Sequence, residues 1–136
     1  MKQVPKLLLS LALVGLGIPA MADSFWNHNG SVMRLSGEGT DRNFTYETPS
    51  AKMRQTGVTS GTLLFNGTNQ NGRYSGTAYV FSKYCSEPLP YDVSGSVKDN
   101  GTKIEMTGKR EIFAKGCIAT GRYTTDKLIF TYIRTE

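Results

Sequence analysis

The chain has 136 residues, of which 38% are hydrophobic, and carries 16 Lys or Arg against 11 Asp or Glu, a formal net charge of +5. This length supports one domain with a single core and excludes a large multidomain enzyme. The basic excess is too small to indicate nucleic-acid binding.

The first 22 residues have the pattern of a secretory signal peptide. Lys2 and Lys6 precede an apolar run over 7–17, and an Ala-Met-Ala cleavage site occupies 20–22. The apolar run is too short to span a bilayer, which needs about 20 apolar residues. We therefore expect an exported protein, periplasmic or secreted, without a transmembrane span.

The expected mature chain, 23–136, is a single β domain with a smaller charge. Removal of Lys2 and Lys6 leaves 14 Lys or Arg against the same 11 Asp or Glu, a net charge of +3. A weak positive charge favours loose attraction to anionic surfaces. Export also places the protein in an oxidising compartment that lacks ATP, which excludes ATP-dependent functions.

Fifteen glycines and short alternating runs indicate an all-β domain. A Thr-Pro pair at 48–49 and a glycine at 57 are typical helix boundaries, so one or two helical turns are expected over 49–57. The predicted strands, in chain order, are 31–36, 43–47, 62–65, 73–81, 91–99, 102–110, 121–125 and 127–134.

The strands at 62–65 and 73–81 form the first predicted hairpin, through a polar, glycine-bounded loop at 67–72. Small residues on one face of the second arm favour a narrow, strongly curved interior. The alternate residues that share this face are Tyr74, Gly76, Ala78 and Val80.

The dipeptide Asn100-Gly101 between two alternating runs is the strongest hairpin signal. A two-residue loop there places Val97 opposite Ile104 and gathers the apolar residues on one face. A three-residue loop would place Val97 opposite Lys103 and mix the faces, so the two-residue register is predicted. This register also pairs Gly95 with Met106 and Val93 with Gly108.

Seven to eight short antiparallel strands predict a meander that closes into a small barrel, with a β-sandwich as the alternative. Closure removes exposed strand edges, which favours the barrel. The last strand, 127–134, is apolar on both faces, so we expect it to be covered on both sides.

Cys85 and Cys117 are the only cysteines, and in an oxidising compartment we expect a disulfide between them. Closure of a loop of this size corresponds to roughly 3.7 kcal/mol of stabilisation. The alternative, a reactive or metal-binding pair, has neither a C-x-x-C motif nor an adjacent histidine to support it.

Several short stretches resemble small exported proteins of uncharacterised function from alphaproteobacteria. These stretches are Trp-Asn-His-Asn-Gly-Ser at 26–31, Arg-Tyr-Ser-Gly-Thr-Ala at 73–78, Val-Ser-Gly at 93–95 and Thr-Gly-Lys-Arg at 107–110. The resemblance spans most of the mature chain and implies no particular activity.

The chain also resembles calycin-type β-barrels such as lipocalins and avidins. Those proteins place a lone Trp at the start of the first strand and an Arg on the last strand, and Trp26 and Arg134 match these places. The flanking Phe-Trp-Asn departs from the Gly-x-Trp of those families. The resemblance implies that Arg134 covers Trp26 in a cation–π contact at one end of the barrel.

The segment 83–91 is the strongest candidate for surface recognition. Two prolines and the expected disulfide stiffen it, and its adhesive side chains are Tyr84, Leu89 and Tyr91. The alternative interpretation is a plain connection between strands. Trp26 is a further binding candidate.

His28, the only histidine, is also a candidate binding residue, although an isolated histidine near an N-terminus is more often a surface or capping residue. No triad or metal-ligand spacing accompanies it, so we expect no catalytic residue, metal or cofactor. Basic and aromatic residues alternate over 73–84, which is typical of single-strand binders, but export argues against a nucleic-acid partner.

Together these features predict an exported, non-enzymatic binding or envelope-associated module. Its partner is expected to be a protein, a glycan or a small apolar molecule. A secreted effector or inhibitor of another protein is the first alternative. A small extracytoplasmic hydrolase that uses carboxylates or His28 is the second.

Cleavage after Ala22 is directly testable. Because the Ala-x-Ala motif ends there, the intact mass of the exported protein should correspond to a chain that begins at Asp23. Exported protein that retains Met1 would contradict the prediction.

Overall fold

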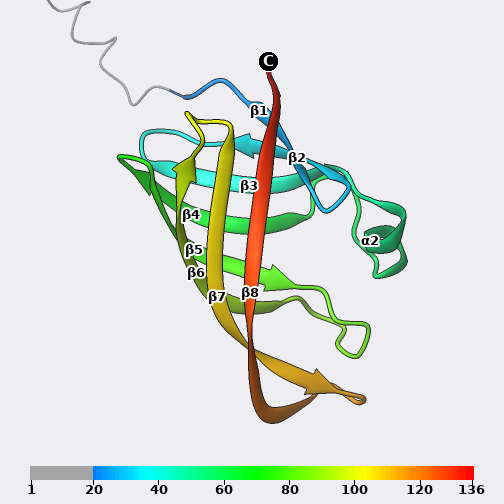
Figure 1. The fold of residues 1–136 in the computed structure, drawn as a ribbon. Coiled ribbons are helices and arrows are strands. Elements are labelled where there is room, and N and C mark those ends of the chain that lie inside the picture. The colour runs from blue at the N-terminus through cyan, green and yellow to red at the C-terminus, as the bar shows by residue number, and fades with distance from the viewer. Residues whose placement is uncertain (1–19) are drawn as a thin grey trace, which may run out of the picture.

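The computed structural model describes residues 20–136, which form a closed barrel of antiparallel strands (Figure 1). Each strand pairs with its neighbour in sequence, and the last pairs with the first. The predicted barrel is therefore confirmed over the sandwich. The strands are β1 (Ser24–His28), β2 (Ser31–Ser36), β3 (Asp41–Thr48), β4 (Leu63–Gln70), β5 (Arg73–Val80), β6 (Leu89–Lys98), β7 (Lys103–Ala114) and β8 (Ile118–Thr135).

Residues 1–19 of the predicted signal peptide lie outside the described residues. Between residues 20 and 136, no helix is both long enough and apolar enough to cross a membrane.

The predicted short helix is present as α2 (Ala51–Gln55). Its N-cap is Ser50, whose Oγ accepts a hydrogen bond from the Met53 amide, and not the Thr of the Thr-Pro pair. Thr48 cannot cap the helix because it is still the last residue of β3. Met53 packs against the barrel core and thereby anchors α2 to it.

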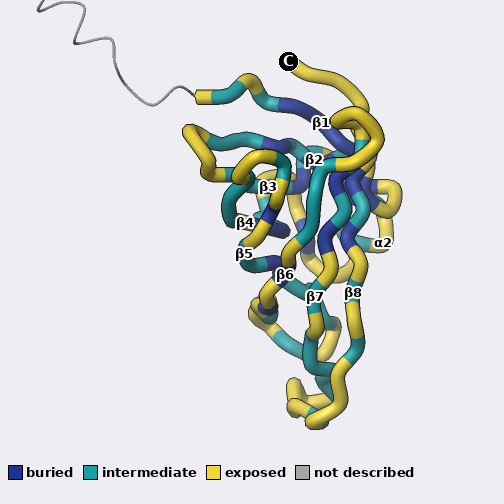
Figure 2. Tube along the Cα trace, turned by 60° about the vertical axis from the view of Figure 1, so that its left-hand side comes forward, coloured by how far each residue is buried: buried dark blue, intermediate teal, exposed yellow. Residues whose placement is uncertain are grey.

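Aromatic rings fill the barrel interior. The rings of Phe44 and Phe130 stack face to face with centroids 3.9 Å apart, and both side chains are fully buried. Trp26 lies beside them, edge-on to Phe44, and its Nε1 donates a hydrogen bond to Ser24 Oγ. Figure 2 shows the buried residues gathered in the barrel, whereas the far end of β7 and β8 is mostly exposed.

Phe25 lies where β1 closes the barrel against β8, on the opposite face of β1 from Trp26. Its ring lies between two guanidinium groups, with Arg34 at 4.9 Å and Arg134 at 4.2 Å from the centroid. The expected contact of Arg134 with Trp26 is therefore wrong. In the β1–β8 ladder Arg134 stands opposite Phe25, so it covers that ring instead.

Only β2 has the predicted limits, and the largest differences are at three places. The segment that contains Trp26 is itself strand β1, which the strand pattern did not predict and only the calycin resemblance implied. β4 continues to Gln70, so the loop to β5 is only Asn71-Gly72 and not 67–72. The segments 121–125 and 127–134 belong to the single strand β8.

The expectation that the end of β8 is covered on both sides is also wrong. Leu128 and Phe130 are buried, but Tyr132 and Ile133 are each 42% exposed.

The register around Asn100-Gly101 is confirmed from Lys98–Lys103 through Val97–Ile104 to Ser94–Thr107. The ladder then stops, so the predicted pairing of Val93 with Gly108 is not part of it.

Two glycines of this hairpin are required for different reasons, which gives a test. A Cβ at Gly95 would overlap the backbone oxygen of Glu105, whereas a Cβ at Gly101 would meet open space. Gly101 has a φ of +85°, which disfavours other residues. We expect Gly95→Ala to lower the free energy of unfolding by about 3 kcal/mol and Gly101→Ala by about 1 kcal/mol. Equal costs in urea denaturation would contradict this account of the β6–β7 contact.

Candidate functional site

The barrel wall opens between β6 and β7. Beyond the Ser94–Thr107 pair, residues 89–93 of β6 stay paired with β5, whereas residues 108–114 of β7 stay paired with β8. A Cβ at Gly108 would still overlap the backbone oxygen of Asp92, so the strands stay close at that point and separate beyond it. We call the gap between the two halves of the wall the side opening. β7 and β8 continue past it as a two-stranded ribbon (Figure 1).

The disulfide ties the ribbon back to the barrel. Cys85 lies in the β5–β6 loop and Cys117 in the turn between β7 and β8, with their Cα atoms 4.8 Å apart. The predicted disulfide is therefore confirmed. It joins the two sides of the opening at the end where no ladder connects β6 to β7.

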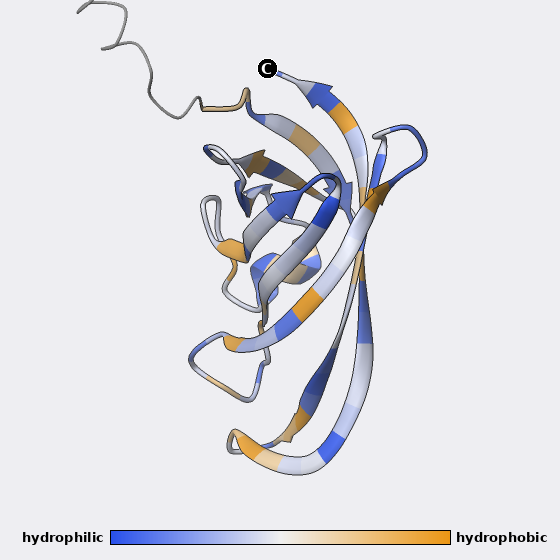
Figure 3. Ribbon diagram, turned by 90° about the vertical axis from the view of Figure 1, so that its left-hand side faces the viewer, coloured by the Kyte–Doolittle hydropathy of each residue, from blue (hydrophilic) through white to orange (hydrophobic). Residues whose placement is uncertain are grey.

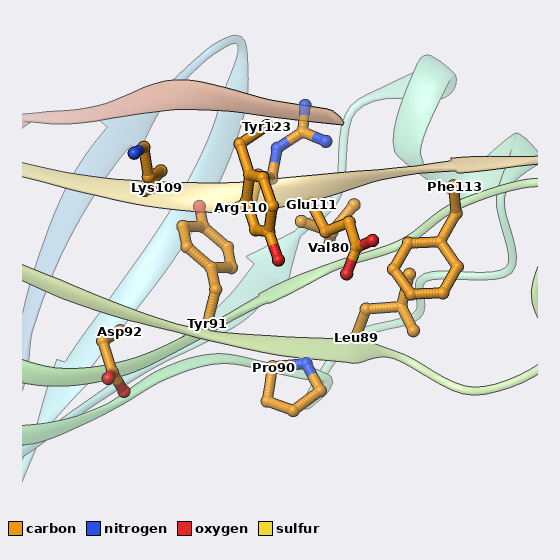
Figure 4. Close-up of a pocket in the computed structure, with 10 residues that line it drawn as sticks. All are labelled: Val80, Leu89, Pro90, Tyr91, Asp92, Lys109, Arg110, Glu111, Phe113 and Tyr123. Atoms are coloured by element: carbon orange, nitrogen blue, oxygen red, sulfur yellow. The ribbon is translucent and has the colours of Figure 1, made fainter. Parts of the chain in front are cut away.

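A pocket of about 510 Å³ occupies the side opening (Figure 4). Rings reach into it from both edges, with Tyr91 on β6 and with Phe113 and Tyr123 on the ribbon. Its wall combines apolar and charged side chains, which are Val80, Leu89, Pro90, Asp92, Lys109, Arg110 and Glu111.

Side chains replace the missing backbone ladder inside the opening. Tyr91 of β6 donates a hydrogen bond from its hydroxyl to Asp126 Oδ2 of β8 at 3.0 Å. Arg110 of β7 donates from Nε to the same oxygen at 2.6 Å. Burial, and then the negative charge of Asp126, raise the pKa of Tyr91 well above its usual value, so the phenol stays a neutral donor.

His28 is buried, with 5% of its surface exposed, and is not the surface or capping residue expected from the sequence. Its ring stacks on Phe130 at 4.5 Å, and Nδ1 lies 2.9 Å from the backbone oxygen of Ile129. Because a carbonyl only accepts hydrogen bonds, we assign the proton to Nδ1, which leaves a lone pair on Nε2. Burial lowers the pKa of His28, so the ring is neutral at pH 7.

A second pocket of about 210 Å³, which we call the inner pocket, lies beside His28 and is bounded by the β1–β2 turn and α2 as well as by strands. Tyr46 and Leu64 line it together with Tyr91 and Asp126, so it adjoins the side opening at the Tyr91 side chain. Burial raises the pKa of Tyr46 to about 12, which keeps its hydroxyl neutral as well. This inner pocket therefore presents uncharged aromatic groups and one carboxylate.

The predicted binding residues separate into three groups. Leu89 and Tyr91 line the opening, but as residues of β6 and not of a surface loop; Tyr91 is 9% exposed. Tyr84 is 40% exposed and lines a smaller adjoining pocket that shares Leu89 and Phe113 with the opening. Trp26 is a core residue that does not line the opening.

Several lining or supporting residues were not anticipated as a site, among them Val80, Lys109, Arg110, Phe113, Tyr123 and Asp126. They come from three strands and carry no local motif. If the predicted β6–β7 register is continued past Val93, Tyr91 stands opposite Arg110. This is the one signal in the sequence that pointed to the site.

Within residues 20–136, no three His, Cys, Asp or Glu side chains come together in a group that could hold a metal ion. No protein-family model matches the chain, and the searches found no curated protein and no solved structure similar to it.

The buried histidine makes stability depend on pH. The folded state holds the pKa of His28 below its ordinary value of 6.5, so the unfolded chain binds more protons as the pH falls below that value. We expect the urea midpoint to decrease from pH 7.5 towards the lower folded pKa. In the His28→Asn variant, which keeps a hydrogen-bond donor near Ile129, the urea midpoint should decrease less over the same pH range than in the parent.

The chain has a single histidine, so the imidazole C–H signals in an NMR titration report on His28 alone. A midpoint at or above 6.5 would contradict the assignment.

Proposed function

We propose that this protein is a non-enzymatic binding module that holds a small molecule in the side opening. The proposed ligand has an apolar, preferably flat, body and one anionic group. The observation that carries the proposal is the pocket of about 510 Å³ between strands that are joined there only by side chains and a disulfide. Ligand pockets are typically concave, mostly apolar sites of this size with a few polar groups.

The apolar part of the ligand is assigned from the rings on both edges. Tyr91, Phe113 and Tyr123 all line the opening; in Figure 4 Tyr123 is drawn next to Tyr91, and Leu89 next to Phe113. Aromatic side chains give large contact areas and prefer offset or edge-on packing, which suits a flat ligand.

The anionic group is assigned from two cations in the wall. Lys109 forms no ion pair with any residue from 20 to 136, and its Nζ lies 5.9 Å from the Tyr123 ring centroid. Arg110 uses Nε for Asp126, which leaves its terminal nitrogens for a ligand. The wall also contains two carboxylates, Asp92 and Glu111. Glu111 already accepts a hydrogen bond from the Gly121 amide.

Binding is favoured over catalysis because the polar groups satisfy one another. Asp126 accepts from both Tyr91 and Arg110, so its carboxylate is held by two donors and is a poor general base. His28 is separated from the opening by Tyr91 and belongs to the inner pocket.

Two fluorescent probes that differ in charge test this proposal. Anilinonaphthalene sulfonate and neutral N-phenyl-1-naphthylamine should both gain fluorescence with the oxidised, processed chain. Leu89→Ser should weaken both by about tenfold because it removes an apolar contact. Lys109→Gln should weaken only the sulfonate, by about fivefold, because it removes a charge.

Ile133→Ser is the matched control, since Ile133 is an exposed apolar residue that lines neither this pocket nor the one adjoining it. It should leave both affinities unchanged, and all variants should keep the parental melting temperature. Equal binding by Leu89→Ser and the parent would place the probes elsewhere and refute the site.

A further inference from the structure

The disulfide-bonded end of the molecule carries the net positive charge of the described chain. We call this end the clasp tip, and define it as residues 82–88 of the β5–β6 loop with residues 109–125 of the β7–β8 ribbon. The tip has five Lys or Arg and two carboxylates, whereas the rest of residues 20–136 has nine of each. The charge is therefore localised and not spread over the barrel.

Most of these cations remain available to a partner. Arg110 is paired with Asp126, one residue beyond the tip. The other four form no ion pair with another described residue; they are Lys83, Lys109, Lys115 and Arg122. The tip thus presents positive charge to its surroundings, screened only by solvent.

Large apolar side chains are exposed among these cations. Ile118 is 62%, Tyr123 57% and Tyr84 40% exposed. Two of the aromatic rings have a lysine beside them, with Lys83 Nζ at 5.3 Å from the Tyr84 centroid and Lys109 near Tyr123. Hydrophobic and hydrophilic segments accordingly lie next to each other at the end of the ribbon (Figure 3).

We propose that the clasp tip docks on an anionic phospholipid bilayer. Lysine and arginine are attracted to anionic headgroups, and tyrosine is enriched at the interface between headgroups and acyl chains. An exposed isoleucine at the turn can enter the acyl boundary, as the apolar residues of interfacial segments do. The tip shares Lys109 and Tyr123 with the pocket, so the test uses Ile118 and Lys115, which do not line it.

The shape of the tip favours a bilayer over a protein partner. The ribbon is two strands wide and projects from the barrel (Figures 1 and 2). A stable protein interface buries about 800 Å² on each partner, which requires a broader surface. A bilayer instead accepts a narrow tip and needs only a few inserted side chains. The disulfide holds both arms of the tip together and lowers the cost of ordering them on binding.

Sedimentation with lipid vesicles tests the proposal. The oxidised, processed chain should bind phosphatidylcholine vesicles that contain about 30% phosphatidylglycerol, and bind pure phosphatidylcholine far more weakly. Salt at about 0.5 M should weaken binding, because it shortens the screening length. Lys115→Gln should reduce vesicle affinity about fivefold, and Ile118→Ser should reduce it by a similar factor.

Each variant has a matched control at the opposite end of the barrel. Arg73→Gln removes one exposed cation at the start of β5, and Ile133→Ser removes an exposed isoleucine of the same strand β8. Both should bind vesicles as the parent does. Equal loss in Lys115→Gln and Arg73→Gln would mean that overall charge, not the tip, directs binding.

Two further results would overturn the proposal. One is equal binding to anionic and neutral vesicles. The other is displacement by soluble polyglutamate together with full binding by Ile118→Ser, which would identify a polyanion-binding surface without insertion. Because Ile118→Ser should retain probe binding in the side opening, failure here is distinguishable from failure of the proposed function.

Discussion

The parting of β6 from β7 is the constraint on which the rest of the structure depends. β7 and β8 pair with each other well past the last β6–β7 pair, Ser94–Thr107, so the long strands cannot complete the barrel wall along their whole length. A sheet that parts in this way leaves backbone groups and apolar side chains without neighbours. The Tyr91–Asp126–Arg110 contacts and the disulfide both lie where that ladder is missing. The pocket and the projecting tip are consequences of the same difference in strand length.

The polar contacts in the opening determine its arrangement more than its stability. The ion pair of Arg110 with Asp126 is nearly a third exposed on each side, and such pairs contribute at most about 1 kcal/mol. The Tyr91 hydroxyl is different, because it is largely buried and would be costly to leave without a partner. Its neutral phenol donates to a carboxylate from the facing strand, which fixes how far β6 stands from β8. A ligand in the opening would meet a wall whose polar groups already have defined positions.

The sequence predicted the parts of the fold that depend on local pattern. The Asn100-Gly101 register, the helix before Gly57 and the pairing of the two cysteines follow from turn chemistry, helix boundaries and compartment. β1 was missed because Phe25 and Trp26 are adjacent and both buried, which conceals the alternation; two arginines cover the outward ring. Pro90 suggested a loop, yet β6 tolerates it where the strand has only one neighbour. The site residues come from four strands, and only the full register brings them together.

The two ends of the barrel differ in a way that directs function to one of them. At the closed end, stacked and edge-on rings of Phe44, Phe130 and Trp26 fill the interior, and β1 seals the wall against β8. Close-packed aromatic interiors deform little. At the open end, two strands part and a loop and a ribbon are held by one disulfide. Local opening requires least free energy where backbone pairing and buried contacts are fewest. Local opening is therefore expected at the end where ligand binding and surface docking are proposed, while the aromatic end keeps the strands in register.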